Sequence, residues 1–133
     1  MPLAQFARNY RTAAVKTATP GQLVLMLFDG ALRNLATALA GFEIEDVGAR
    51  IEQINNHLLK TQAILLELRA SLDLKAGGDF ANRMFALYEF MNSRLQAANL
   101  AKDPEPIRLV EKLLGEVREG WATMLGQKRA EAL

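Results

Sequence analysis

The sequence contains no cysteine among its 133 residues, and its one histidine is His57. Disulfides and thiol chemistry are therefore excluded, and the lack of cysteine fits a reducing compartment. A single histidine cannot supply the paired Glu-x-x-His motifs of bundle metal sites, nor the familiar nucleophile–base arrangements. We predict a protein that is not an enzyme, without catalytic, metal or cofactor-binding residues. We interpret His57 as a surface residue that is solvated or hydrogen-bonded.

An excess of one charge and a long apolar run are also lacking. Sixteen basic and fifteen acidic residues give a net charge of +1, which offers no electrostatic reason to bind nucleic acid. The longest uninterrupted apolar run, residues 23–28, is too short to span a bilayer, and no apolar stretch of a signal peptide is visible. Gly77-Gly78 lacks the spacing and the lysine of a phosphate loop. We expect a cytoplasmic protein without nucleic-acid binding or membrane insertion.

Helical periodicity is what the sequence does contain. Hydrophobic residues make up 50% of the chain and charged residues 23%, as in ordinary globular domains. Thr19-Pro20-Gly21-Gln22 forms a capping box with a proline in the first turn, and aspartates precede each later helix as expected caps. These aspartates are Asp46, Asp79 and Asp103.

Apolar residues recur at steps of three and four along each segment, which defines one core-facing seam per helix. The second seam comprises Val47, Ile51, Ile54, Leu58, Thr61, Leu65, Leu68 and Leu72; the third comprises Met84, Tyr88, Met91, Leu95 and Ala98; the fourth comprises Ile107, Val110, Leu114, Val117, Trp121 and Leu125. We predict a single domain, residues 1–133, with helices over 19–41, 46–72, 79–101 and 103–126 and fraying after Gln127. The absence of period-two alternation predicts no strands. The expected fold is an all-α, antiparallel, up-down-up-down four-helix bundle.

Residues 1–18 are expected to form a separate N-terminal segment, helical in part or mobile. Leu3, Phe6 and Tyr10 share one helical face, but a helix of three turns is marginal in water unless it docks. We therefore predict that these three residues act as a lid on the bundle.

The first three predicted helices carry more apolar residues than one core stripe requires. The surplus is either a wide core or a surface kept for a partner, which a second copy of the chain or another protein would cover. Methionines such as Met26 and Met91 suit adaptable surfaces, although a core accommodates them equally well. Tyrosines such as Tyr10 and Tyr88 combine a ring with a polar tip and are common interface anchors.

Two long motifs resemble those of a known family. Thr17-Ala18-Thr19-Pro20, Gln22-Leu23-Val24 and Met26-Leu27-Phe28-Asp29-Gly30-Ala31 are similar to the opening T-A-S-P-x-x-L-I-x-M-L-Y-D-G-A of the bacterial flagellar export chaperone FliS. Gly77-Gly78-Asp79-Phe80-Ala81, Leu87-Tyr88-Glu89-Phe90-Met91, Arg94-Leu95 and Ala98-Asn99 resemble its later segment. Phe28 and Phe90 stand where the family pattern has tyrosine, so a hydroxyl is lost at each.

The resemblance implies a flagellar secretion chaperone that binds the disordered C-terminal segment of flagellin in the cytoplasm, blocks premature polymerisation and keeps the subunit competent for type III export. The client segment would form helices in apolar grooves of the chaperone. We predict client contacts at Tyr10, Met26, Leu59, Gln62, Leu66, Leu87, Tyr88, Phe90, Met91, Arg94 and Asn99. Export-gate components are further candidate partners, and a monomer or weak homodimer is expected. The alternative is a homo-oligomeric helical-bundle adaptor for another secretion-system subunit.

Overall fold

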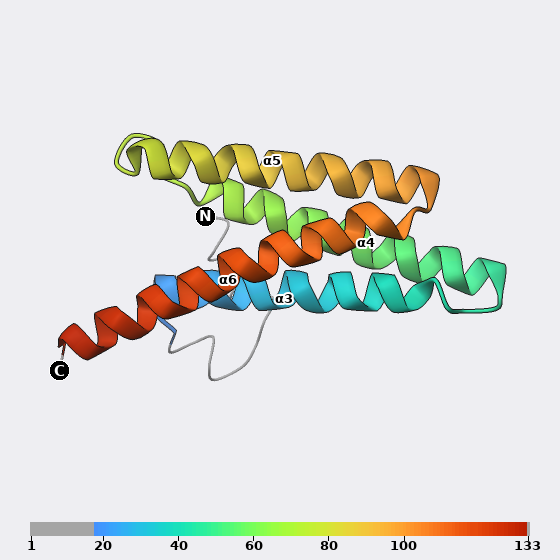
Figure 1. The fold of residues 1–133 in the computed structure, drawn as a ribbon, viewed down its shortest axis with the longest axis horizontal. Helices are drawn as coiled ribbons and strands as arrows, with labels where there is room; N and C mark the ends of the chain where they lie inside the picture. The colour runs from blue at the N-terminus through green and yellow to red at the C-terminus, as the bar shows by residue number, and fades with distance from the viewer. Residues whose placement is uncertain (1–17, 133) are drawn as a thin grey trace.

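A computed structural model of the chain describes residues 18–132, and the lid residues Leu3, Phe6 and Tyr10 lie outside this range. The described residues form four helices and no strand: α3 (Pro20–Gly41), α4 (Val47–Ala70), α5 (Gly78–Ala101) and α6 (Pro104–Ala132). Successive helices run in opposite directions, and each packs chiefly against two others in the order α3, α4, α5, α6 (Figure 1). The predicted all-α, antiparallel four-helix bundle is confirmed.

Local capping chemistry explains where α3 and α4 begin. Thr19 Oγ1 accepts a hydrogen bond from the Gln22 backbone N–H at 3.2 Å, and Gln22 Oε1 accepts one from the Thr19 N–H at 3.0 Å. Asp46 Oδ2 accepts from the Ala49 N–H at 2.8 Å. These side chains satisfy N–H groups that have no partner within the helix. The capping box predicted from the sequence is therefore present.

The start of α5 differs from the sequence prediction. Gly77, not Asp79, occupies the N-cap position, and no side chain caps the helix there. Asp79 lies in the first turn, where its negative charge favours the positive end of the helix dipole. Asp73, in the preceding turn, accepts hydrogen bonds from the N–H groups of Lys75 and Ala76 instead.

The core is a column of apolar side chains drawn from all four helices. Its fully buried large members are Leu27, Phe28, Leu35, Ile54, Leu58, Leu65, Leu68, Met91, Leu95, Ile107, Val110 and Leu114. The predicted seams account for most of them, but Val47 and Ile51 are 56% and 45% exposed, so their assignment to the seam is wrong. The first turns of α4 extend past the ends of the neighbouring helices, so no helix covers them (Figure 1).

Two features of the helices also depart from expectation. The last helix continues to Ala132 because good helix formers follow Gln127, whereas the sequence predicted fraying there. Among the described helices, α3 is long and apolar enough to cross a membrane by length and composition alone. That is weak evidence, since α3 supplies Leu27, Ala31 and Leu35 to the bundle core.

Candidate functional site

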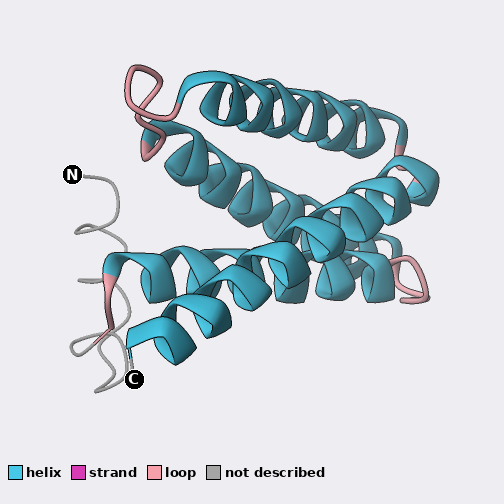
Figure 2. Cartoon of the chain, turned by 60° about the vertical axis from the view of Figure 1, so that its left-hand side comes forward, coloured by secondary structure: helices cyan, strands magenta, loops and turns pink. Residues whose placement is uncertain are grey.

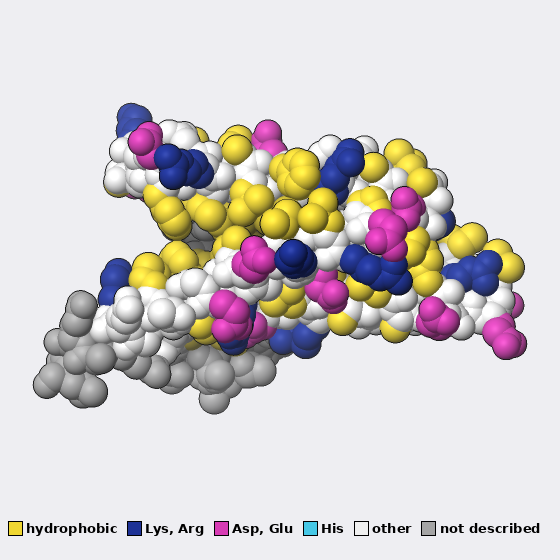
Figure 3. Space-filling model, in the orientation of Figure 1, with side chains coloured by type: hydrophobic (Ala, Val, Ile, Leu, Met, Phe, Trp, Pro, Cys, Tyr) yellow, Lys and Arg dark blue, Asp and Glu magenta, His cyan; other side chains and the backbone are white. Residues whose placement is uncertain are grey.

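The helix pair α3–α6 diverges from the pair α4–α5 toward the end of the bundle that carries the α4–α5 turn (Figure 2). An apolar groove of about 730 Å³ opens between the pairs, and Figure 3 shows it as a hollow flanked by hydrophobic side chains. We call it the end groove. All four helices and the α4–α5 turn line it: Val24, Phe28, Leu68, Ser71, Leu72, Asp73, Ala76, Gly77, Phe80, Ala81, Met84, Tyr88, Val117, Gly120, Trp121 and Met124.

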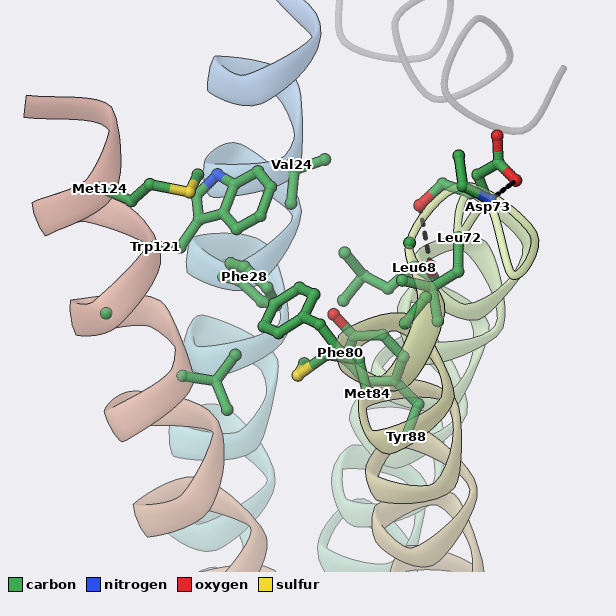
Figure 4. A pocket seen from close by; sticks show the side chains of 16 residues that line it. Val24, Phe28, Leu68, Leu72, Asp73, Phe80, Met84, Tyr88, Trp121 and Met124 are labelled. Carbon is green, nitrogen blue, oxygen red and sulfur yellow. Dashed lines mark hydrogen bonds between the residues drawn. The ribbon is translucent and has the colours of Figure 1, made fainter. Parts of the chain in front are cut away.

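Trp121 forms the α6 wall of the end groove and is held in place by two contacts with α3 (Figure 4). Its indole Nε1 donates a hydrogen bond to the Gly21 carbonyl oxygen at 2.8 Å. Its ring meets Phe28 edge-to-face, with centroids 6.2 Å apart and planes at 71°. One turn earlier, Arg118 Nε donates to Asp29 Oδ1 at 2.8 Å, which also joins α6 to α3. The α6 wall is therefore a fixed surface.

The opposite wall comes from α5 and differs in character. Phe80 is 62% exposed, Met84 is half-buried, and Tyr88 lies at the bottom with only 4% exposed (Figure 4). Burial raises the pKa of the Tyr88 hydroxyl well above its usual range, so it stays neutral at any physiological pH. With Met124 on the facing helix, Met84 gives the groove flexible, polarizable side chains that accommodate varied partners.

The turn between α4 and α5 closes the end of the groove and depends on Gly77. A Cβ atom at this position would lie 2.5 Å from the Cβ of Ala81 and 2.7 Å from the Asp73 carbonyl oxygen. The Gly77 N–H also donates to that oxygen at 2.8 Å. Only glycine permits this close approach of the turn to the first turn of α5. Asp73 is the one charged residue among the described groove-lining residues, and it lies at the rim (Figure 4).

A second set of exposed apolar residues lies on the outer surfaces of α4 and α5. Leu59 and Leu66 on α4 are 52% and 44% exposed, and Phe90 on α5 is 46% exposed. Beside them, Arg69 Nη1 pairs with Glu89 Oε1 at 2.9 Å and stacks 5.3 Å over the ring of Phe85. This ion pair links the exposed surfaces of α4 and α5 next to these apolar residues.

The chain was compared with known proteins. The family model for "Flagellar protein FliS" matches residues 3–128. The flagellar secretion chaperone FliS of Salmonella typhimurium is 39% identical over 109 residues, covering 82% of this chain and 78% of that protein. FliS of Bacillus subtilis is 32% identical over 122 residues, covering 92% and 87%. FliSB of Pseudomonas aeruginosa is 36% identical over 109 residues, covering 82% and 83%.

The chain belongs to the FliS family. This confirms the resemblance drawn from the two sequence motifs. FliS is a family of flagellar secretion chaperones and not of enzymes. The groove and the exposed residues of α4 and α5 are thus the surfaces to consider for binding a client.

The predicted contact residues of this FliS-family chain range from exposed to fully buried. Leu59, Gln62 and Asn99 lie together in a depression between α4 and α5, and Leu66, Phe90 and Arg94 are exposed on these helices. Met26 and Leu87 are half-buried and pack against the core. Tyr88 and Met91 are 4% and 0% exposed, so both belong to the core, although Tyr88 also reaches the end groove. Tyr10 lies outside the described residues.

Sequence reasoning missed the contribution of α6. Client contacts were placed on the first three helices, whereas Val117, Gly120, Trp121 and Met124 form one wall of the end groove. A signal was present, since the fourth seam ends in the large side chains of Trp121 and Leu125 and a glycine, Gly120, precedes Trp121. To predict from this signal that α6 lines a groove, one would need to know that α6 faces α5 across an open space.

Proposed function

We propose that this chain is a cytoplasmic chaperone that binds the disordered C-terminal segment of flagellin and holds it in a state competent for export. The observation that supports this most is the end groove. It is apolar and open to solvent, and Asp73, the one charged residue among its described lining residues, lies at the rim. An exposed cavity of this kind suits the apolar face of an amphipathic helix from a partner.

The energetics require a larger contact than the end groove alone. Ordering a disordered segment on binding costs roughly 2–5 kcal/mol, and interfaces that tolerate such a cost commonly bury more than about 2,000 Å². The exposed side chains of Leu59, Leu66 and Phe90 extend the apolar surface along α4 and α5. We infer that the client occupies the end groove and continues over these helices, where Gln62 and Arg94 bind its polar groups.

This binding mode prevents polymerisation by occupancy. Flagellin segments that are ordered on the chaperone cannot pair with other flagellins, and release at the export apparatus would free them. Export-gate components are the natural further partners of such a complex. The step needs no nucleotide and no chemical reaction, and the chaperone would act as a monomer or a weak homodimer.

The alternative is a homo-oligomeric adaptor, in which a second copy of the chain covers the same apolar surface. Sedimentation at several concentrations separates the two proposals. A chaperone stays monomeric or weakly dimeric and changes mass when the flagellin peptide is added. An adaptor that assembles through the groove forms larger oligomers as its concentration rises. Its self-association also competes with binding of the peptide.

Gly120 provides a direct test of the end groove. It lines the groove on α6, and a Cβ atom there would have no heavy atom within 4 Å. Gly120→Leu should therefore fill the groove without a clash, and helix propensity should raise stability by about 0.8–1 kcal/mol. Calorimetric titration with a C-terminal flagellin peptide should show binding at least about tenfold weaker, because the Leu side chain occupies the site of the client.

Gly115→Leu is the matched control. Gly115 lies on the same helix with equally open space around its Cβ position, but it does not line the end groove. This variant should gain similar stability and bind the peptide like the wild type. Equal binding by both variants would show that the client does not use the end groove.

A further inference from the structure

A polar pocket lies between α4 and α5, toward the end of the bundle opposite the end groove. It has a volume of about 570 Å³, and its lining includes four side-chain amides, two exposed leucines and one lysine. We call it the amide pocket. Its described lining residues are Asn55, Leu59, Gln62, Gln96, Asn99, Leu100 and Lys102. None of them carries a negative charge.

A directional chain of hydrogen bonds sets the polarity of the amide pocket. Lys102 Nζ donates to the Asn99 carbonyl oxygen at 2.7 Å and also to Asn99 Oδ1. An ammonium group can only donate, so it fixes the orientation of the Asn99 amide. Asn99 Nδ2 then donates to Asn55 Oδ1 at 2.9 Å.

In the network of Lys102, Asn99 and Asn55, both side-chain oxygens accept hydrogen bonds, while several N–H groups donate none. Both side-chain oxygens of the asparagine pair already accept a hydrogen bond, whereas the Asn55 amide N–H groups and one N–H of Lys102 are not used within it. Gln96 adds another amide to the same lining. Gln62 Nε2 donates to the Asn92 carbonyl oxygen at 3.5 Å, so this amide presents its oxygen, and the pocket offers both donors and an acceptor. The Lys102 ammonium and the unused Asn55 N–H groups lie together, and this pair of donors favours an anionic acceptor.

The backbone at Lys102 supports a role for its side chain. Lys102 has φ 52° and ψ 50°, and it is the one non-glycine residue with positive φ among residues 18–132. Glycine is usual in this left-handed position after a helix because a side chain there is strained. The side chain of Lys102 lines the amide pocket, and strained residues are concentrated at functional sites.

We propose that the amide pocket binds a carboxylate of the polypeptide client. The Lys102 ammonium and the amide N–H groups contact the carboxylate oxygens, and Leu59 and Leu100, 52% and 84% exposed, pack on the apolar neighbour of the acidic group. The carboxylate belongs either to an acidic side chain or to the chain terminus of the client. This inference rests on the proposed function and identifies a second, polar anchor for the same client.

Calorimetric titration of four proteins against three sets of flagellin C-terminal peptides tests the proposal. The proteins are wild type, Lys102→Gly, Lys102→Arg and the exposed-lysine control Lys112→Ala. The peptides are the free acid, its C-terminal amide, and versions with each Asp or Glu changed to Asn or Gln. Lys102→Gly relieves the left-handed strain, so it should melt no lower than wild type.

We expect Lys102→Gly to weaken binding of the free-acid peptide about three- to tenfold, because a charge-assisted hydrogen bond that solvent partly screens contributes less than a buried one. Lys102→Arg should retain most of the affinity, Lys112→Ala should retain all of it, and the loss should shrink at high salt. Neutralising one peptide carboxylate should remove the difference between wild type and Lys102→Gly. A C-terminal amide with this effect identifies the chain terminus as the ligand, and an internal Asn or Gln identifies an acidic side chain.

Two results would overturn the proposal, and they differ in scope. If the wild type binds the peptide but no neutralised carboxylate changes the effect of Lys102→Gly, the amide pocket does not bind a carboxylate and the proposed function stands. If the wild type binds no flagellin peptide, the proposed function fails and this inference fails with it.

Discussion

Leu65 and Leu66 are adjacent residues of α4 that should respond in opposite ways to the same substitution. Leu65 is 1% exposed and packs in the core, while Leu66 is 44% exposed. Truncating a fully buried leucine to alanine costs about 2–5 kcal/mol, because a cavity remains after the apolar contacts are lost. Leu65→Ala should therefore lower the free energy of unfolding by about 3 kcal/mol.

Leu66→Ala should lower the free energy of unfolding much less than Leu65→Ala does, and it should weaken client binding more. Burying a whole leucine side chain is worth about 1.5–3 kcal/mol, so the half that is already covered contributes about 1 kcal/mol to folding. The exposed half offers a similar amount to a client that covers it. A loss of about 1 kcal/mol corresponds to roughly fivefold weaker binding at 25 °C.

Urea denaturation and calorimetric titration with the flagellin peptide measure the two quantities for each variant. At a temperature where both variants are folded, Leu65→Ala should bind within about twofold of wild type, because its side chain does not face the client. The assignment would be refuted if Leu66→Ala lost as much stability as Leu65→Ala and bound the peptide normally. Leu66 would then belong to the core.

Three further predictions concern the turn, the N-terminal segment and the histidine. Gly77→Ala should lower the free energy of unfolding by about 1–3 kcal/mol in urea, since its Cβ would meet Ala81 and the Asp73 carbonyl; unchanged stability would mean that the turn relaxes. Deleting residues 1–12 should tighten client binding or raise self-association if Leu3, Phe6 and Tyr10 form a lid; unchanged titration and sedimentation would count against it. Burial, with a smaller effect of Lys60, lowers the pKa of His57, so its stabilising contribution is present above pH 6.5 and declines as the pH falls below that value; His57→Gln should flatten this part of the stability profile.

Much of the fold could be predicted because helix periodicity and capping are local properties of the sequence. Thr19 and Gln22 form their capping box from residues three positions apart, and Leu58 and Leu65 lie on the buried face that their spacing indicated. The residues that the periodicity assigned wrongly lie where a helix extends past the ends of its neighbours. Ile51 keeps the periodic spacing, yet it is exposed because the beginning of α4 has no helix packed over it.

The candidate binding surfaces could be predicted only in part from the sequence. A surplus of apolar residues on α4 and α5 correctly marked Leu59, Leu66 and Phe90 as exposed, but the same argument could not separate them from buried Tyr88 and Met91. All five are apolar or aromatic residues on amphipathic helices. Their exposure depends on which helix lies opposite, and the spacing of residues along one helix does not give that information.

The sequence by itself determined that this chain is a helical bundle of the FliS family, because periodicity and motifs are properties of contiguous residues. The tertiary structure decided where the bundle opens, since the end groove requires the pair α3–α6 to diverge from the pair α4–α5 toward the end that carries the α4–α5 turn. It also brought Asn55 to Asn99 and the neighbouring Lys102, because Asn55 and Asn99 meet only when α4 and α5 pack side by side.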